Sequence, residues 1–481
     1  MKRLSVIFFI TIFFVATNTE AQRYLTPQFT NVKVTKNVKY GTNLSYVTSF
    51  LTPEDLLMDV YEPDGDTATN RPVIILGHAG SFLNIFPWGN KEQYSVVELC
   101  NRFAKLGYVA ISIGYRIGWA ATSSDPETRE KTIINAVYRA MQDFKTCVRY
   151  LRKTYEENQN PYRIDPCKIF VGGTNSGGYA SLAVSNLNKQ SELTGVKFLD
   201  SNGNPYVDQS KTGDFDGFGG TQNIDNHKGY NSMPSAVLAL GAATGDTMWI
   251  EPGEIPVVAF HGVEETNTPY NTAIVITGSG TAIIVVSGSG DYMPRVERVG
   301  NNNIFKNAGL PQGPPNKNGA GQITQPVEGL YPFYGEKFEP WSWYDANQPV
   351  GDATLNPNAS EAKAKRYIDT IMSYTAPRFK AIIDANIPCQ LKTSVHENLS
   401  NTLSFSLLPN PASEWVTIML SDFNEKIIEA SIYNLNGTKV MSSKGDSYYL
   451  TLPVSQLSNG IYFVEAATSS TKKAFKVIVQ H

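Results

Sequence analysis

The sequence predicts an α/β protein, with a mostly parallel central sheet and helices on both faces, followed by a small C-terminal β-sandwich. Two observations indicate the first part. Continuous apolar runs that end in glycine, such as residues 71–80 (RPVIILGHAG), are typical of buried parallel strands. They alternate with segments whose apolar residues recur at helical spacing, such as residues 130–154. Short strands and turns from residue 405 onward indicate the second part.

The bulk composition sets limits on size and partners. With 481 residues, 41% of them hydrophobic, the chain can form two or three domains with sizeable cores. Its formal net charge of −3 gives no electrostatic reason to expect a nucleic-acid partner. The cysteines match no zinc-site spacing, and we expect no cofactor and no metal. The sequence does not decide how its cysteines pair, and three complete sets of disulfides are possible. Free buried thiols are the alternative. The cysteines are Cys100, Cys147, Cys167 and Cys389.

The N-terminus has the pattern of a secretory signal. Lys2 and Arg3 precede the apolar run 4–16, and the TEA sequence that ends at Ala21 is typical of a signal-peptidase site. We therefore expect a signal peptide over residues 1–21, with an uncleaved membrane anchor as the alternative. Export would place the cysteines where disulfides are allowed.

The elements after the signal follow the order of such a fold. Residues 31–40 and 56–63 alternate polar and apolar positions, which predicts antiparallel edge strands. Beyond them, apolar runs predict buried strands and periodic segments predict helices. We expect strands at 71–80, 108–116, 168–173, 235–243 and 255–262, helices at 94–107, 130–154, 177–187 and 362–383, polar loops at 200–232 and 307–327, and a strand–turn–strand at 273–290.

One short motif suggests chemistry. Residues 170–179 (FVGGTNSGGY) run from an apolar strand through glycines and a polar kink into a small-residue helix start, which is the shape of the nucleophile elbow G-x-S-x-G. Gly173 and Gly177 fit its two glycines, and Asn175 stands where the serine belongs. An amide has no hydroxyl to deprotonate, yet Asn tolerates the left-handed backbone of such a turn. Ser176 becomes the alternative nucleophile only if the turn shifts by one residue.

Residues 31–388 resemble the α/β-hydrolase superfamily, and within it the secreted esterase- and lipase-like members. The resemblance rests on landmarks in the family's order: an oxyanion loop after the strand at 71–80, the elbow, an acid-bearing strand end (IPVVAFHGVEETNTPY, 255–270) and a loop where relatives carry the histidine (LYPFYGEKFEPWSW, 330–343). It implies a carboxylic-ester hydrolase scaffold with a Ser–acid–His triad.

The resemblance assigns a role to each position of this chain. Asn175 takes the nucleophile position, Glu265 the acid position and Phe338 the base position. Phenylalanine cannot accept a proton, and none of the five histidines lies between Glu265 and the end of the domain. The oxyanion donors would be backbone N–H groups of Ala79 or Gly80 and of Ser176.

Two tryptophans lie near the expected mouth of the pocket. Trp341 and Trp343 are ordinary packing residues by default, and a stacking platform for a sugar or an aromatic ester is the alternative. A small ester or a glycan is therefore the ligand that we expect.

The C-terminal segment resembles the type IX secretion C-terminal sorting domain, type A. The segments that carry this resemblance are LLPNPASEWVTI, IYNLNGTKV, LPVSQLSNGIYFVEA and KKAFKVIV. It implies export from a Bacteroidota-type cell, type IX secretion machinery as a partner, and a secreted or cell-surface protein. A generic carbohydrate-binding or immunoglobulin-like sandwich is the alternative. We expect a signal peptide (1–21), a hydrolase-like domain (22–390), a linker (391–404) and a sorting domain (405–481).

These observations leave two hypotheses for function. The first is a catalytically impaired pseudo-hydrolase, a pseudoenzyme with a ligand-binding or surface role, because nucleophile and base positions are both substituted. The second is an active extracellular carboxylic-ester hydrolase that uses Ser176.

Overall fold

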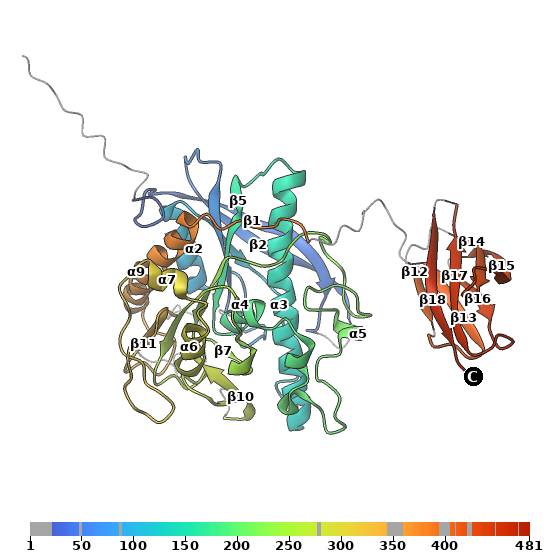
Figure 1. The fold of residues 1–481 in the computed structure, drawn as a ribbon. Helices are drawn as coiled ribbons and strands as arrows, with labels where there is room; N and C mark the ends of the chain where they lie inside the picture. The colour runs from blue at the N-terminus through green and yellow to red at the C-terminus, as the bar shows by residue number, and fades with distance from the viewer. Residues whose placement is uncertain are drawn as a thin grey trace, which may run out of the picture. The chain divides into compact units, whose positions relative to one another are not determined.

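The computed structural model (Figure 1) describes most of the chain. The described residues are 22–47, 51–85, 89–276, 280–343, 359–393, 405–408, 410–420, 426–447, 449–469 and 471–481. The predicted signal peptide and residues 394–404 of the predicted linker lie outside them. Two compact units divide at residues 393 and 394, and each is considered by itself. Within the described residues, the helices are too short or too polar to cross a bilayer.

An eight-stranded sheet forms the centre of the first unit, in the order β1-β2-β4-β3-β5-β6-β8-β11. The first two strands pair antiparallel, as their alternating pattern predicts, and β2 also pairs antiparallel with β4. All pairs from β4 to β11 are parallel. The strands are β1 (Val32–Leu44), β2 (Pro53–Pro63), β3 (Arg71–Gly77), β4 (Val109–Ile113), β5 (Ile164–Thr174), β6 (Ala236–Leu240), β8 (Val257–Gly262) and β11 (Leu330–Phe333).

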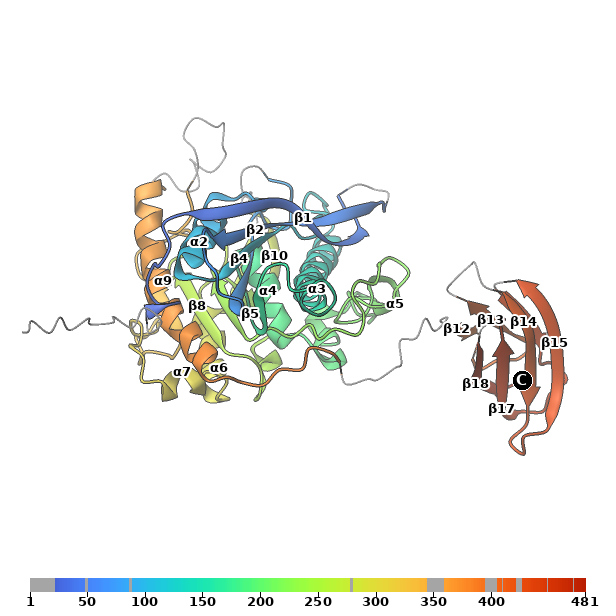
Figure 2. The same cartoon turned by 90° about the horizontal axis from the view of Figure 1, so that it is seen from above.

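Helices cover both faces of this sheet (Figures 1 and 2), which confirms the predicted fold class. Strand β3 shows why: Val73 and Ile75 pack into one hydrophobic cluster with α3 and α4, whereas Ile74 and Leu76 pack into the other with α2 and α9. A strand that is apolar on both sides needs cover on both sides. The helices are α2 (Tyr94–Leu106), α3 (Pro126–Glu157), α4 (Ser176–Asn186), α5 (Gln209–Thr212), α6 (Ser289–Arg298), α7 (Asn303–Asn307) and α9 (Glu361–Asp384).

A three-stranded antiparallel sheet lies beside the main sheet. It contains β7 (Ala243–Thr244), β10 (Ala282–Gly288) and β9 (Ala273–Ile276). The last two strands pair antiparallel, as expected for the strand–turn–strand at 273–290.

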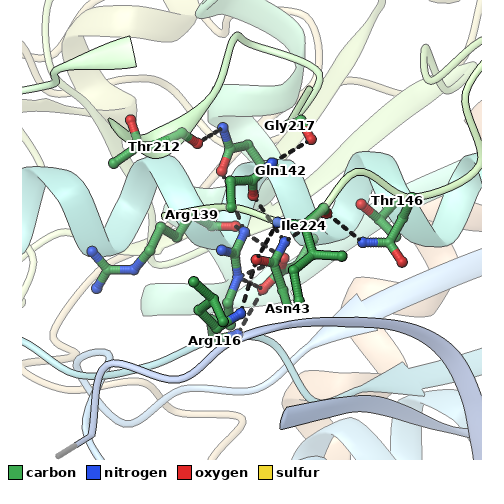
Figure 3. Close-up of polar contacts among 12 residues, drawn as sticks. Asn43, Arg116, Arg139, Gln142, Thr146, Thr212, Gly217 and Ile224 are labelled. Atoms are coloured by element: carbon green, nitrogen blue, oxygen red, sulfur yellow. Dashed lines mark hydrogen bonds and ion pairs between the residues drawn. The ribbon is translucent and has the colours of Figure 1, made fainter. Parts of the chain in front are cut away.

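Buried polar contacts hold the long polar insertion against α3 (Figure 3). The insertion was expected as a plain loop at 200–232, and it contains the short helix α5. The Gln142 side chain on α3 donates to the carbonyl of Thr212 at 2.9 Å. Beside it, Arg116 and Asp143 form an ion pair of 2.8 Å, and both side chains are almost fully buried. These contacts fix the wall of the pocket described below.

One disulfide closes the first unit. Cys167, near the start of β5, is bonded to Cys389, which follows α9 at a separation of 222 residues. The other two cysteines, Cys100 and Cys147, are free and buried. The bridge therefore ties the C-terminal end of the unit to its central sheet.

The second unit contains two antiparallel sheets, β12-β13-β16 and β15-β14-β17-β18. Their inward side chains, among them Val416, Ile432 and Val464, share one hydrophobic core. This is the predicted β-sandwich. Its strands are β12 (Phe405–Leu408), β13 (Trp415–Leu420), β14 (Ile427–Tyr433), β15 (Lys439–Ser447), β16 (Tyr449–Pro453), β17 (Gly460–Ala467) and β18 (Lys472–Val479).

We predict that Asp143→Ala strongly destabilises the first unit. The change leaves the Arg116 guanidinium buried without its partner, which costs about 3–5 kcal/mol in comparable sites. Thermal unfolding measures the loss. Asp55→Ala is the control, because it breaks an ion pair with Lys39 in which both side chains are half exposed, and it should hardly change the midpoint. Equal effects of the two substitutions would contradict a buried network.

Candidate functional site

The strand–turn–helix at the end of β5 has the geometry of a nucleophile elbow. Asn175 sits between β5 and α4 with φ 48° and ψ −116°, a strained backbone conformation. The two glycines of the motif are required because other parts of the backbone approach them too closely for a side chain. A Cβ on Gly177 would lie 2.4 Å from the backbone of Gly77, and a Cβ on Gly173 would lie 2.5 Å from the backbone of Gly177. The turn is therefore retained although its central residue is Asn.

The Asn175 carboxamide is engaged at both ends. Its Oδ1 accepts a hydrogen bond from the backbone N–H of Ser176 at 2.8 Å, and its Nδ2 donates to Thr268 Oγ1 at 3.2 Å. The Ser176 N–H is one of the predicted oxyanion donors, and it points from the N-terminus of α4. The Ser176 N–H therefore already has a protein acceptor.

Ser176 is buried behind the elbow, with 1% of its surface exposed. Its Oγ lies 3.0 Å from the Tyr115 hydroxyl, and it also donates to the His78 carbonyl at 3.4 Å. Tyr115 in turn donates to the same carbonyl at 2.6 Å. Within the described part of the chain, none of the Ser176 hydrogen bonds involves an imidazole nitrogen.

The loop after β3 supplies the other predicted oxyanion donors. The Ala79 N–H donates to Gln93 Oε1 at 2.7 Å, so it too has a protein acceptor. Gly80 has φ 106°, and a Cβ there would lie 2.6 Å from the Cα of Gly89. Ala79 and Gly80 both line the pocket.

Glu265 lies just beyond β8 with its side chain fully buried. Neither carboxylate oxygen has a hydrogen-bond partner among the described residues. Burial raises the pKa of Glu265 well above its ordinary value, and the nearby Glu339 raises it further, while the backbone N–H groups of Thr268 and Gly262 act weakly in the opposite direction. These surroundings therefore favour the protonated form of the side chain.

His261 does not complete a triad, although its Nε2 lies 3.6 Å from the Glu265 carboxyl group. Burial lowers the pKa of His261 to about 4, so the ring stays neutral. Its Nε2 faces the Thr268 carbonyl at 3.0 Å, and its Nδ1 faces the Ser289 hydroxyl. With both nitrogens engaged, the ring orients the loop after β8.

Glu339 was not predicted, and it bonds to the residue before the elbow residue and also acts on the pKa of Glu265. Its Oε2 accepts hydrogen bonds from Thr174 Oγ1 and Ser342 Oγ, each at 2.9 Å. Thr174 directly precedes Asn175, and Glu339 lines the same pocket as Asn175. A carboxyl group therefore lies next to the residue that precedes the elbow residue. Its neighbour Phe338, which we expected at the base position, lines the pocket with a half-buried ring.

A pocket of about 580 Å³ opens above the elbow. Its walls are largely apolar side chains from the oxyanion loop, α3, α4, the polar insertion and the β9–β10 hairpin, including Phe82, Ile134, Val137, Leu187, Val207 and Ile283. Its floor is polar and contains Asn175, Ser176, Thr268 and Glu339. This combination of apolar walls and a few polar groups is typical of small-molecule sites. The described residues contain no cluster of His, Cys, Asp or Glu suited to a metal ion.

Two family models match the sequence. Residues 58–279 match the family described as BD-FAE, and residues 406–480 match the secretion system C-terminal sorting domain. The chain therefore carries an esterase-like α/β-hydrolase domain and a type IX sorting domain. The sorting domain indicates export by type IX secretion, through interaction with the secretion machinery, to the cell surface or the extracellular space.

The protein is distantly similar in structure to Thermogutta terrifontis esterase 2. The propionate-bound form of this esterase is 15% identical in sequence, with a TM-score of 0.36. The alignment covers 72% of the present protein and 97% of the esterase chain. The form phosphoramylated by tabun is also 15% identical, with a TM-score of 0.35. The alignment again covers 72% of the present protein and 97% of the esterase chain. A comparison with curated protein sequences finds no match.

The two predicted stacking tryptophans do not line the pocket of the hydrolase domain. Trp341 is fully buried, and its Nε1 donates to Thr174 Oγ1 at 2.8 Å. Trp343 is half-buried beside Tyr94, with their ring centroids 5.9 Å apart. The burial of Trp341 favours the packing role that we expected by default over the alternative of a stacking platform, because a buried ring has no face free for a ligand. Trp341 instead positions the Thr174 hydroxyl that bonds Glu339.

We predict that Glu265→Gln is more stable than the parent chain at pH 8, and that the difference shrinks toward pH 5. The raised pKa means that folded Glu265 keeps a proton that the unfolded chain releases above pH 4.5, so the parent loses stability as the pH rises. Glutamine does not titrate. Urea unfolding at several pH values measures the difference. A Gln variant that is less stable at pH 8, or a difference that does not vary with pH, would contradict the neutral buried acid.

Proposed function

We propose that the hydrolase domain is a catalytically impaired relative of esterases that binds a small apolar molecule outside the cell. The observation that carries this proposal is the hydrogen bond of 2.8 Å between Asn175 Oδ1 and the N–H of Ser176. The residue in the nucleophile position has no hydroxyl, and its own carboxamide occupies an oxyanion donor.

The rest of the floor supports the same proposal. Triad members act as one unit, so loss of the nucleophile or the base removes most of the rate. Here residue 175 is Asn, which has no hydroxyl, and the side chain that bonds to Thr174 beside it is a carboxyl group, Glu339. Glu265 stands at the acid position, and the imidazole 3.6 Å from it, His261, has both ring nitrogens engaged with Ser289 and Thr268.

The pocket supports a binding role. Its walls remain apolar and its volume suits a small organic molecule. A small ester with an apolar body fits these walls better than a glycan, since a sugar needs many polar partners. The expected glycan platform also lacks support, because Trp341 is buried.

The alternative is hydrolysis through Ser176. It would require the Ser176 hydroxyl to leave Tyr115 and the His78 carbonyl, and to find a proton acceptor in the pocket. A serine with 1% exposure is poorly placed for attack. The structure gives this alternative no specific support.

Removal of a signal peptide over residues 1–21 remains part of the proposal. Lys2, Arg3 and the apolar run after them support it, and the sorting domain, a type IX export signal, is consistent with it. Type IX export also supports a Bacteroidota-type source.

We predict that the full chain has negligible activity on p-nitrophenyl butyrate, and that Asn175→Ser with Glu339→His gains activity. The double change places a hydroxyl at the elbow and an imidazole between it and Glu265. We expect turnover to rise on the order of 10²-fold, the scale of general-base catalysis. Release of p-nitrophenolate measures the rate.

The matched control is Asn175→Ser with Phe338→His, which moves the imidazole by one residue. This variant should stay inactive, because residue 339 and not 338 accepts the hydrogen bond from Thr174. Substantial activity of the parent chain that Ser176→Ala abolishes would overturn the proposed function and support the alternative.

A further inference from the structure

At the opposite end of α4 from the elbow, the pocket contains a buried acceptor that lacks a donor. Asn186 is 1% exposed and lines the pocket, and its Oδ1 has no hydrogen-bond partner among the described residues. Its Nδ2 has a long contact of 3.5 Å with Thr244 Oγ1. A buried acceptor left without a donor costs free energy, because it has lost its hydrogen bond to water. A donor on a ligand in the cavity would remove this cost.

The neighbouring donors of the protein are already used. Thr244 Oγ1 donates to the carbonyl of Asp246 at 3.3 Å, so its proton is directed away from Asn186. The Lys197 ammonium group donates to the carbonyl of Gly245, the residue after Thr244, and it does not line the pocket. The hydrogen bond that Asn186 Oδ1 lacks is therefore left for a ligand.

The walls beside Asn186 suit an apolar body. Leu187 follows Asn186 in the sequence and lines the pocket, and so do Phe198 and Trp249. These two rings pack together with their centroids 5.1 Å apart, so they form one continuous apolar surface. A ligand can therefore bury its hydrocarbon part here while a single polar group reaches the amide.

The missing group is a donor without charge. Asn186 offers a neutral oxygen, and burying an ion against a neutral partner is costly. An ionised carboxylate carries acceptors alone, and the described residues that line the pocket include no Lys, Arg or His to balance it. A hydroxyl group supplies one donor and no charge, which matches the site.

This subsite is distinct from the floor at the elbow. Asn175 precedes α4 and Asn186 ends it, so their backbones lie about 16 Å apart along the helix. The pocket includes both residues. A ligand held at Asn186 therefore does not depend on the polar groups beside Asn175.

We infer that the pocket takes an apolar molecule with a hydroxyl group, which donates to Asn186 Oδ1 while the apolar body lies against Leu187, Phe198 and Trp249. The inference rests on the proposed function, because it names the class of ligand for the same pocket.

The test compares octan-1-ol with heptyl methyl ether and octanoate. The alcohol and the ether have the same number of heavy atoms, and the ether has lost the donor. Isothermal titration calorimetry with the full chain at pH 7 should show the alcohol binding about tenfold more tightly than the ether, since a site with an unpaired buried acceptor discriminates against a ligand without the donor. Octanoate should bind most weakly.

Asn186→Leu should remove the preference for the alcohol and leave the affinity for the ether unchanged, which also shows that the variant is folded. Asn186→Ala is a second variant with less bulk, and it should lose the preference in the same way. Asn188→Leu is the matched control, because Asn188 is exposed and does not line the pocket. That variant should keep the full preference.

Each other outcome counts against a defined claim. Equal affinity for alcohol and ether, a preference for octanoate, or an alcohol preference that survives the Asn186 substitutions overturns the inference and leaves the proposed function in place. Failure of all three ligands to bind overturns both the inference and the proposed binding role.

Discussion

In the function that we propose, a single hydrogen bond, from the N–H of Ser176 to Asn175 Oδ1, limits what this scaffold can do. The elbow forces the first N–H groups of α4 toward the pocket, where a hydrolase uses one of them to stabilise negative charge. Here the side chain of the elbow residue itself accepts that N–H. The interaction satisfies the N-terminus of the helix and supports the strained turn at φ 48°, and it leaves that oxyanion donor unavailable to a substrate.

The remaining floor follows from the same substitution. Without a serine at residue 175 there is nothing for an imidazole to deprotonate, and the place beside the elbow holds Glu339. Burial, reinforced by the nearby Glu339, raises the pKa of Glu265 well above its ordinary value. In the proposed function the polar floor no longer serves catalysis, whereas the apolar walls still line a pocket for a small molecule.

Periodic and steric signals made the fold and the elbow predictable. Strand β3 and its neighbours follow from continuous apolar runs, and the elbow follows from Gly173 and Gly177, which no larger residue can replace. Glu339 could not be placed in this way, because its loop has no periodicity and an error of one residue exchanges it with Phe338. The burial of Trp341 and the bridge between Cys167 and Cys389 depend on contacts between segments far apart in sequence. A signal for Glu339 was present nonetheless, since a carboxylate beside an apolar residue in a pocket loop is a candidate proton acceptor.

The central claim is that the elbow carries no activated serine. The most direct measurement is intact-mass spectrometry of the full chain after incubation with a fluorophosphonate, which phosphonylates serines activated by a triad. The account predicts an unchanged mass, because residue 175 is Asn and the Ser176 hydroxyl bonds to Tyr115. A single adduct that peptide mapping places on Ser176 would contradict it.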